Sequence, residues 1–454
     1  MNSLKRFKSW YDANFTLVKK DFFQFLRFQS ICTDPAYKKE TLACADWLTD
    51  YLKKNGLHAE LIKTSGFPII YGESLSENPR AETVLIYGHY DVQPVDPIEL
   101  WKSPPFEPTE REGKVFARGA LDDKGQIFYA CLAAIAWKKM GLPLPVNLKF
   151  CIEGEEEAGS KALAKALPSL KKKMKADSLA IIDFGAMEDG TPAVTLGARG
   201  IVSLEVTLQG SNGDLHSGLY GGIAYNPNRA LAELLSKLWD KKGRVKVPGF
   251  YEDVVKPSKK ELKQYTYSFD KAALAKHFGI REIGGEKNLS MMEANWFRPT
   301  LEINGMFGGY TGAGFKTVIP AVAAAKISCR LVQNQNPKKV SRAVAEYLQK
   351  LAPSGMKIKV ELLGGEGAFH GSVNAKVVKA FADAATDATG KKCAILSAGG
   401  SIPIVAEMMR ALKVEIVGVG YGLATDNIHA PNEHFDMKRF EKGFLTVAGA
   451  IERL

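Results

Sequence analysis

Three apolar segments that each end in acidic residues constrain the fold of this 454-residue chain more than any other feature. The runs at 83–87, 147–152 and 179–182 are short and apolar, as the buried strands of a parallel sheet are. His89 and Asp91 follow the first run, and Asp183 follows the third. In α/β proteins, sites form where strands open into loops at their carboxyl ends. We therefore expect an α/β sheet that gathers these side chains at one edge.

Each of these motifs also has a plainer explanation when it is taken alone. Asp122 and Asp123 precede a helix predicted over 126–140, where they would serve as N-caps. The glutamates between 153 and 157, which follow the second run, would form a solvated acidic turn. Four carboxylates within five residues repel one another, however, unless a cation shares their space. Recurrence at three strand ends favours two cations held by mixed nitrogen and oxygen ligands.

Composition excludes several classes of function. The formal charge is +11, but the basic residues are dispersed without interleaved aromatics, so we expect no nucleic-acid partner. No window approaches the roughly 20 apolar residues of a membrane span, and the N-terminus lacks the apolar core of a signal peptide. The six cysteines show no C-x-x-C spacing, and several lie in apolar runs. These features predict a reduced, cytoplasmic protein without a membrane partner.

The chain is long enough for two or three domains. Its character changes at about residue 201, where an alternating strand opens a region of paired strands, with helices predicted at 227–242 and 337–350. Doubly wound character returns after about residue 371. We expect residues 1–200 plus 371–454 to form a metal-binding domain, and residues 201–370 to form an inserted α+β domain.

Two further segments contain candidate functional residues. His216 lies in a loop of the inserted region and His429 follows the last predicted strand; taken alone, His216 has the character of an ordinary loop histidine. The glycine-rich stretch 308–314 lacks the G-K-[ST] ending and the βα context of a phosphate loop, so we exclude that reading.

Six separated motifs occur in an order that identifies a family. They are GHYDVQP (88–94), ARGALDDKG (117–125), EGEEEAGS (153–160), IID (181–183), DLHSG (214–218) and IHAPNE (428–433). The chain thereby resembles, from about 80 to 435, the dinuclear zinc metallopeptidases that include carnosinase, aminoacylase and glutamate carboxypeptidase. WKSPPFEP, KTVIP and GGSIP are typical of its dipeptidase branch, of the carnosinase and Cys-Gly dipeptidase type. The resemblance implies an α/β catalytic domain with a doubly wound, mostly parallel sheet, and an inserted α+β lid that also forms a dimer interface.

The resemblance also implies a ligand set for two zinc ions per subunit. Asp122 would bridge both ions. His89 and Asp183 would complete the shell of one ion, and Glu157 and His429 that of the other. Because histidine and carboxylate ligands without thiolate also accept Mn²⁺ or Co²⁺, the metal itself stays open.

Two residues would support the reaction at these ions. Asp91 would orient His89 through its second ring nitrogen. Glu156 would be the general base that takes a proton from a water shared by the two ions. The family pattern further implies a cis peptide bond between Asp122 and Asp123.

Other residues would bind the substrate. His216 would help stabilise the oxyanion in the active site of the partner subunit, which makes a homodimer part of the site. Arg330 would hold the C-terminal carboxylate of the substrate through a bidentate pair. Thr317 and Ser401 are candidates for hydrogen bonds to the same end of the substrate.

We therefore predict a metal-dependent dipeptidase acting on dipeptides or short peptides with a free C-terminal carboxylate. One alternative is an N-acyl amino acid deacylase of the acetylornithine or succinyl-diaminopimelate type. The other is an inactive binding protein. Two departures from the family bear on this prediction. Ser397 and Ala398 stand where carnosinase-like relatives often have a charged pair, and Glu155 leaves the register of the catalytic glutamate open.

Overall fold

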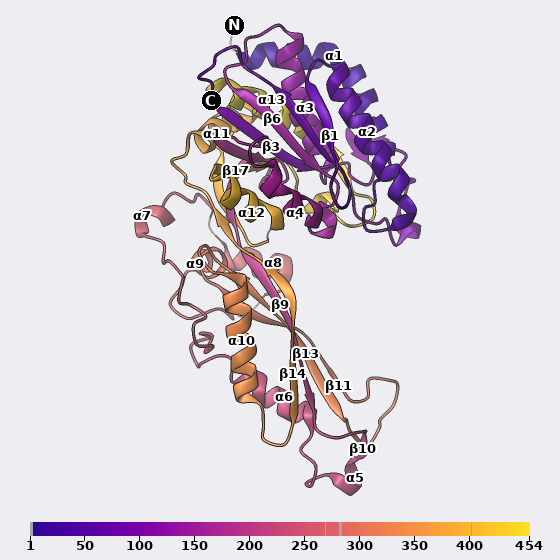
Figure 1. Ribbon diagram of the computed structural model, residues 1–454, viewed down its shortest axis with the longest axis vertical. Coiled ribbons are helices and arrows are strands. Elements are labelled where there is room, and N and C mark those ends of the chain that lie inside the picture. Colours follow the sequence, from indigo (N-terminus) through magenta and orange to yellow (C-terminus); the bar gives the residue numbers. More distant parts are fainter. Residues whose placement is uncertain (1–2, 268, 281–283, 401) are drawn as a thin grey trace.

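The computed structural model describes residues 3–454 except 268, 281–283 and 401. Figure 1 shows two parts: a layered main body that contains both ends of the chain, and an elongated part that projects from it. We call residues 3–198 and 369–454 the main body and residues 199–368 the inserted segment. The main body is a mixed α/β structure and the inserted segment an antiparallel one.

One large sheet forms the centre of the main body. Its strand order is β1-β2-β6-β3-β7-β17-β8-β15, with β16 beside β8, and its central strands β6, β3, β7 and β17 run parallel. The strands are β1 (His58–Ile62), β2 (Ile69–Ser74), β3 (Thr83–His89), β6 (Asn147–Glu153), β7 (Ser178–Ile181), β8 (Ala193–Ala198), β15 (Phe369–His370), β16 (Ala394–Ala398) and β17 (Glu415–Gly420). A small antiparallel sheet consists of β4 (Thr109–Arg111), β5 (Lys114–Phe116) and β18 (His434–Asp436).

Helices cover both faces of the large sheet (Figure 1). One face packs on α1 (Ser3–Arg27), α2 (Lys38–Lys54), α3 (Lys124–Lys139), α11 (Lys376–Thr389) and α13 (Met437–Arg453), and the other on α4 (Lys161–Leu170) and α12 (Pro403–Leu412). Consecutive residues of β3 divide between them: Ile86 joins the first core, and Leu85 and Tyr87 the second. A strand buried on both faces needs such an uninterrupted apolar run. No helix in the described part of the chain is long and apolar enough to cross a membrane.

The inserted segment is built on a four-stranded antiparallel sheet of order β11-β13-β9-β14. Alternate residues of β9 are buried, because α6 and α10 cover only one face of this sheet. Its elements are β9 (Gly200–Gln209), β10 (Leu215–His216), α5 (Ser217–Tyr220), α6 (Pro227–Ser236), α7 (Lys259–Leu262), α8 (Lys271–Phe278), α9 (Met291–Trp296), β11 (Thr300–Gly308), β12 (Val318–Ile319), β13 (Val322–Leu331), α10 (Pro337–Leu351) and β14 (Lys357–Glu366).

The two ends of the inserted segment leave the main body side by side. Ala198 on β8 pairs with Phe369 on β15, so the chain departs and returns through neighbouring strands. The two chain segments that join the inserted segment to the main body are packed closely, because a Cβ on Gly200 would clash with the carbonyl oxygen of Glu366. Only glycine fits that approach.

Candidate metal centre

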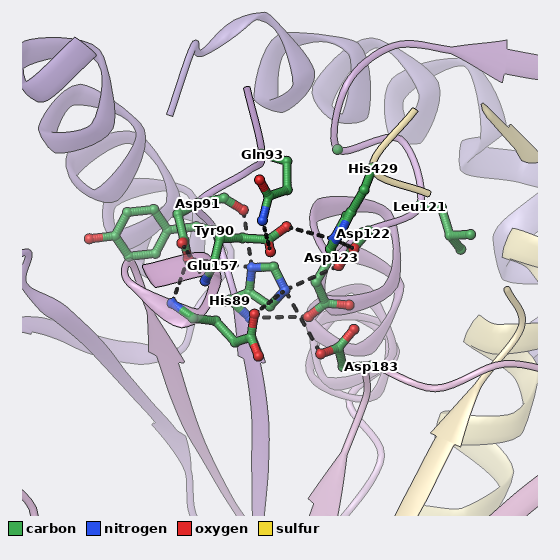
Figure 2. Close-up of polar contacts among 12 residues, drawn as sticks. His89, Tyr90, Asp91, Gln93, Leu121, Asp122, Asp123, Glu157, Asp183 and His429 are labelled. Carbon is green, nitrogen blue, oxygen red and sulfur yellow. Dashed lines mark hydrogen bonds and ion pairs between the residues drawn. The ribbon is translucent and has the colours of Figure 1, made fainter. Parts of the chain in front are cut away.

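Five side chains from separate loops meet at the carboxyl edge of the central strands (Figure 2). His89 ends β3, and Asp183 lies two residues beyond β7. Asp122 precedes α3, Glu157 lies in the single 3₁₀ turn after β6, and His429 lies in the loop after β17. The topology thus brings together all five residues that the family resemblance implies as ligands.

The donor atoms form two groups that share Asp122. Oδ1 of Asp122 lies 3.2 Å from Nε2 of His89, which is also 3.8 Å from Oδ2 of Asp183. Oδ2 of Asp122 lies 2.9 Å from Nε2 of His429, which is 3.2 Å from Oε1 of Glu157. Each oxygen of one carboxylate therefore faces a different group of ligands, which is the arrangement that a bridging ligand needs.

Buried polar atoms in this cluster fit bound cations. Among the described residues, Nε2 of His89 and Oε1 of Glu157 are buried and make no hydrogen bond of good geometry, although Asp122 and His429 lie 3.2 Å from them. An unsatisfied buried polar atom carries a desolvation penalty, which coordination would remove. One imidazole nitrogen and two carboxylates in each group are borderline-to-hard donors that suit Zn²⁺ and Mn²⁺.

The charges of the cluster point to the same conclusion. Burial raises the pKa of Asp183 well above its usual value, and repulsion from Asp122 raises it further. Burial also opposes ionisation of Asp122, but hydrogen bonds from His429 and His89 outweigh it and hold the pKa of Asp122 below its usual range. Hydrogen bonds to Asp122 and Glu157 raise the pKa of His429 to about 10. Positive charge thus favours ionisation of Asp122, whereas Asp183 lacks sufficient compensation, and a cation beside it would supply that charge.

Asp91 joins two sides of the cluster. Nδ1 of His89 lies 3.0 Å from the backbone oxygen of Asp91 and 3.4 Å from its Oδ1. The same carboxylate accepts the backbone N–H groups of Glu156 and Glu157, at 3.3 and 3.1 Å, and the thiol of Cys32 at 3.0 Å. Asp91 therefore reaches His89 as the sequence predicts, chiefly through its backbone carbonyl, while its carboxylate fixes the glutamate turn.

Glu155 and Glu156 point to different places. Oε2 of Glu156 lies 4.0 Å from Nε2 of His89, whereas the carboxylate of Glu155 points to the loop at Gly66, where an added Cβ would meet it. Burial raises the pKa of Glu156 to about 7, against the attraction of His89. A carboxylate that exchanges a proton near neutral pH suits acid–base chemistry. Glu156, and not Glu155, therefore has the placement of a base.

Asp122 and Asp123 are joined by a cis peptide bond, as the resemblance implies. Asp123 occupies the N-cap position of α3 without making a side-chain cap hydrogen bond. Its Oδ2 instead accepts the backbone N–H of His89 at 3.0 Å, and a Cβ on Gly88 would lie 2.5 Å from that oxygen. Asp123 is thus the N-cap residue by position, but its carboxylate holds the end of β3 instead of capping the helix.

Gln93 is a supporting residue to which sequence reasoning gave no role. Its side-chain amide donates to Oε2 of Glu157 at 2.7 Å (Figure 2). Gln93 lies within the GHYDVQP motif, but nothing in the local pattern indicates its partner 64 positions away.

The substrate-binding candidates lie apart from one another. His216 and Thr317 are neighbours, with Nε2 and Oγ1 3.5 Å apart, on the end of the inserted segment that is remote from the main body (Figure 1). Arg330 lies at the opposite end, where it pairs with Ile201 near the main body. Within one chain the structure therefore brings neither His216 nor Thr317 to the metal centre, and it separates Thr317 from Arg330. Ser401 lies outside the described residues.

Arg199 is a second arginine beside Arg330. Burial, together with the nearby charge of Arg330, lowers the pKa of Arg199 to about 10. Nε of Arg199 donates to the backbone oxygen of Gly399 at 3.4 Å. The charge of Glu302 acts on Arg199 and opposes this lowering of its pKa. Two close guanidinium groups favour the binding of a further anion such as a carboxylate.

Known proteins share this architecture. The Cys-Gly metallodipeptidase of Candida albicans is 31% identical over 445 residues, which cover 93% of this chain and 91% of that protein. Human Beta-Ala-His dipeptidase is 31% identical over 382 residues, 83% of this chain and 75% of that protein. The crystal structure of an M20 family metallo-carboxypeptidase from Sulfolobus solfataricus has a TM-score of 0.83 at 34% identity, and covers 96% of this chain and 98% of the other.

These similarities confirm the predicted resemblance, the α/β fold with a mostly parallel central sheet, and the class of enzyme, a hydrolase of peptide bonds. They do not favour the deacylase alternative. The model of peptidase family M20/M25/M40 matches residues 85–453. The chain therefore belongs to peptidase family M20/M25/M40.

Proposed function

We propose that this protein is a metal-dependent dipeptidase that hydrolyses dipeptides, or short peptides with a free C-terminal carboxylate. The observation that carries the proposal is the shared position of Asp122, each of whose oxygens faces one of two complete groups of ligands. The names of the relatives support the substrate class, since Cys-Gly and Beta-Ala-His are both dipeptides.

His89, Asp122 and Asp183 would hold one cation, and Asp122, Glu157 and His429 the other. We propose two Zn²⁺ per subunit, with Mn²⁺ or Co²⁺ as substitutes that the same donors accept. Bound there, the cations would act as Lewis acids and lower the pKa of water.

Glu156 acts on the proton in the proposed reaction. As a water oxygen adds to the scissile carbonyl carbon, Glu156 accepts a proton from that water. When the C–N bond breaks, Glu156 transfers the proton to the departing amine nitrogen. Asp91 supports this step because it fixes the backbone N–H of Glu156.

Arg330, with Arg199 beside it, would bind the C-terminal carboxylate of the substrate. Such a pair selects substrates that end in a free carboxyl group. Ser401 is retained as a candidate at this end of the substrate.

His216 and Thr317 would act in the site of a second subunit. In one chain they lie at the far end of the inserted segment (Figure 1). Leu219 and Ile223 nearby are 68% and 81% exposed, as apolar residues at an interaction surface are. We propose a homodimer in which the inserted segment is the lid and dimerisation domain, and in which His216 stabilises the oxyanion across the interface.

We further propose a cytoplasmic location. Five of the six cysteines are buried free thiols, and the sixth, Cys32, is half-buried. Free thiols persist in reducing compartments.

Hydrolysis of a dipeptide panel and an N-acetyl amino acid panel tests the function. The purified protein is stripped of metal and reloaded with Zn²⁺ or Mn²⁺. Dipeptide turnover should require metal, and Glu156→Ala should reduce kcat by about 10²–10⁴-fold while metal binding persists. Glu155→Ala is the matched control and should retain activity. Cleavage of the N-acetyl panel alone, or metal binding without turnover of either panel, would overturn the dipeptidase assignment.

A further inference from the structure

Glu433, the last residue of the IHAPNE motif, is a fully buried carboxylate. It is not one of the proposed ligands, and the proposed mechanism gives it no role. It nevertheless ends the loop that carries His429, and its carboxylate bonds to the loop that carries Asp122. A buried charge of this kind needs compensating partners, and their identity shows what the residue holds in place.

The carboxylate of Glu433 has four donors, all in the loop that leads to Asp122. Oε1 accepts the backbone N–H groups of Leu121 and Asp122, each at 3.0 Å. Oε2 accepts the backbone N–H of Gly119 at 2.9 Å and Nη1 of Arg118 at 2.8 Å. Three of the four bonds therefore fix backbone positions, and one of these three fixes the ligand residue Asp122 itself.

The loop that carries His429 needs such an anchor. Asn427, His429 and Asn432 have φ angles of 59°, 59° and 65°. This left-handed region is unfavourable for residues other than glycine, although asparagine and histidine adopt it more often than most. Asn432 is held by the backbone of Leu100 and Lys102.

Glu433 adds a second anchor to the His429 loop. Its backbone oxygen accepts the N–H of Ala117 at 3.2 Å. The surroundings therefore hold His429 in a conformation that its own preferences do not favour.

We infer that Glu433 is a positioning residue that sets the separation between Asp122 and His429, and thereby the affinity of the ligand group that these two residues form with Glu157. The inference rests on the proposed metal centre. Glu433 could instead only stabilise the fold, and the two roles depend on different bonds. Stabilisation of the fold would depend on the buried ion pair with Arg118, whereas positioning of Asp122 depends on the three backbone N–H bonds.

Two variants separate these roles. Glu433→Gln keeps the shape of the side chain but places an NH₂ group against backbone donors. Arg118→Met breaks the same ion pair and leaves all three backbone bonds in place. Each metal-free variant is titrated with Co²⁺ and followed by calorimetry and visible absorption, with circular dichroism as the check of folding. His429→Ala gives the reference for a centre in which one ligand group is broken.

Arg118→Met should bind two Co²⁺ with affinities close to wild type, even where its thermal stability is lower. Glu433→Gln should bind one ion normally and the other about 10- to 100-fold more weakly. Its visible absorption on titration with Co²⁺ should differ from wild type in the same way as that of His429→Ala. If Glu433→Gln does not fold, the double variant Arg118→Met/Glu433→Gln is compared with Arg118→Met. The double variant removes both charges of the ion pair, so it leaves no charge buried alone.

A folded Glu433→Gln variant that binds both ions like wild type would overturn the inference. So would equal losses of affinity in Glu433→Gln and Arg118→Met. Wild-type protein that binds fewer than two ions would overturn the proposed metal centre and the inference with it. Wild-type protein that binds two ions without cleaving dipeptides would overturn only the proposed substrate, and the comparison of variants would still decide the role of Glu433.

Discussion

The side-chain amide of Gln93 donates a hydrogen bond to Oε2 of Glu157, and the other oxygen of that carboxylate faces His429 at 3.2 Å. Gln93 thus fixes which oxygen is presented to the cation. Gln93→Leu should weaken binding of one of two Co²⁺ ions by about tenfold or more, because partners that orient a ligand have effects of this size. Calorimetric titration of the metal-free protein measures this. Unchanged affinity in the variant would show that Glu157 is oriented without Gln93.

Removal of metal should destabilise the protein. A ligand present at about 1,000 times its Kd adds roughly 4 kcal/mol to the free energy of unfolding for each site that exists only in the folded state. Denaturant unfolding of the Zn²⁺-loaded protein, with and without a chelator, measures the difference. In His89→Ala about half of this difference should disappear, because the second group of ligands, Asp122, Glu157 and His429, stays intact. An equally large chelator effect in the variant would place the stabilising metal elsewhere.

Arg330→Lys should raise KM for dipeptides by about tenfold with a smaller change in kcat, because lysine cannot form the bidentate pair. Lys326→Ala is the control, since Lys326 lies on the same strand and the same face of the sheet. Dipeptide amides provide the second readout: wild type should cleave them poorly, and Arg330→Lys should cause no further loss. A normal KM in Arg330→Lys would remove this residue from the substrate site.

A mixture of two inactive variants should recover activity. In a dimer that exchanges His216, a heterodimer of Glu156→Ala and His216→Ala contains one site with both residues intact. Subunits mixed after dissociation should therefore regain about a quarter of wild-type activity. Each variant subjected alone to the same treatment is the control. Absence of recovery, with heterodimers demonstrated by differential tags, would show that His216 does not act across the interface.

His370 should make the metal-free protein less stable in acid. Burial lowers the pKa of His370, although Glu261, 3.5 Å away, opposes the shift. Below about pH 6.5 histidine is protonated in the unfolded chain, whereas His370 in the folded chain is still neutral. The free energy of unfolding therefore falls as pH falls from about 6.5 toward the lowered pKa of His370. The free energy of unfolding should depend less steeply on pH in His370→Gln between about pH 7 and pH 5. Parallel curves for both proteins would contradict this.

The pattern of apolar residues in the sequence was enough to predict the strands and the ends at which His89 and Asp183 lie. An apolar run that stops at a polar residue marks a strand that leaves the core. The helix predicted over 126–140 begins two residues earlier, at Lys124. Lysine normally indicates an exposed position, but this side chain is buried and donates to the backbone oxygens of Phe25 and Phe28. Its partners lie almost a hundred residues away, beyond the reach of a local pattern.

Long-range pairing explains the remaining differences. Gln93 and Glu433 lie inside recognised motifs, yet their roles depend on loops that meet only in the folded chain. Thr317, grouped with Arg330 by resemblance, lies instead beside His216, because β10 and β12 pair at the far end of the inserted segment. Neither composition nor periodicity records such pairings.

The pairing of Ala198 with Phe369 has a consequence for how the molecule is assembled. Neighbouring strands lie about 5 Å apart, a gap that a two-residue hairpin turn closes. The segment between them therefore leaves and rejoins the sheet without stretching it, and all five proposed ligands lie outside that segment. In the proposed site Arg330, His216 and Thr317 lie inside it, so these substrate contacts could change while the metal ligands are inherited unchanged.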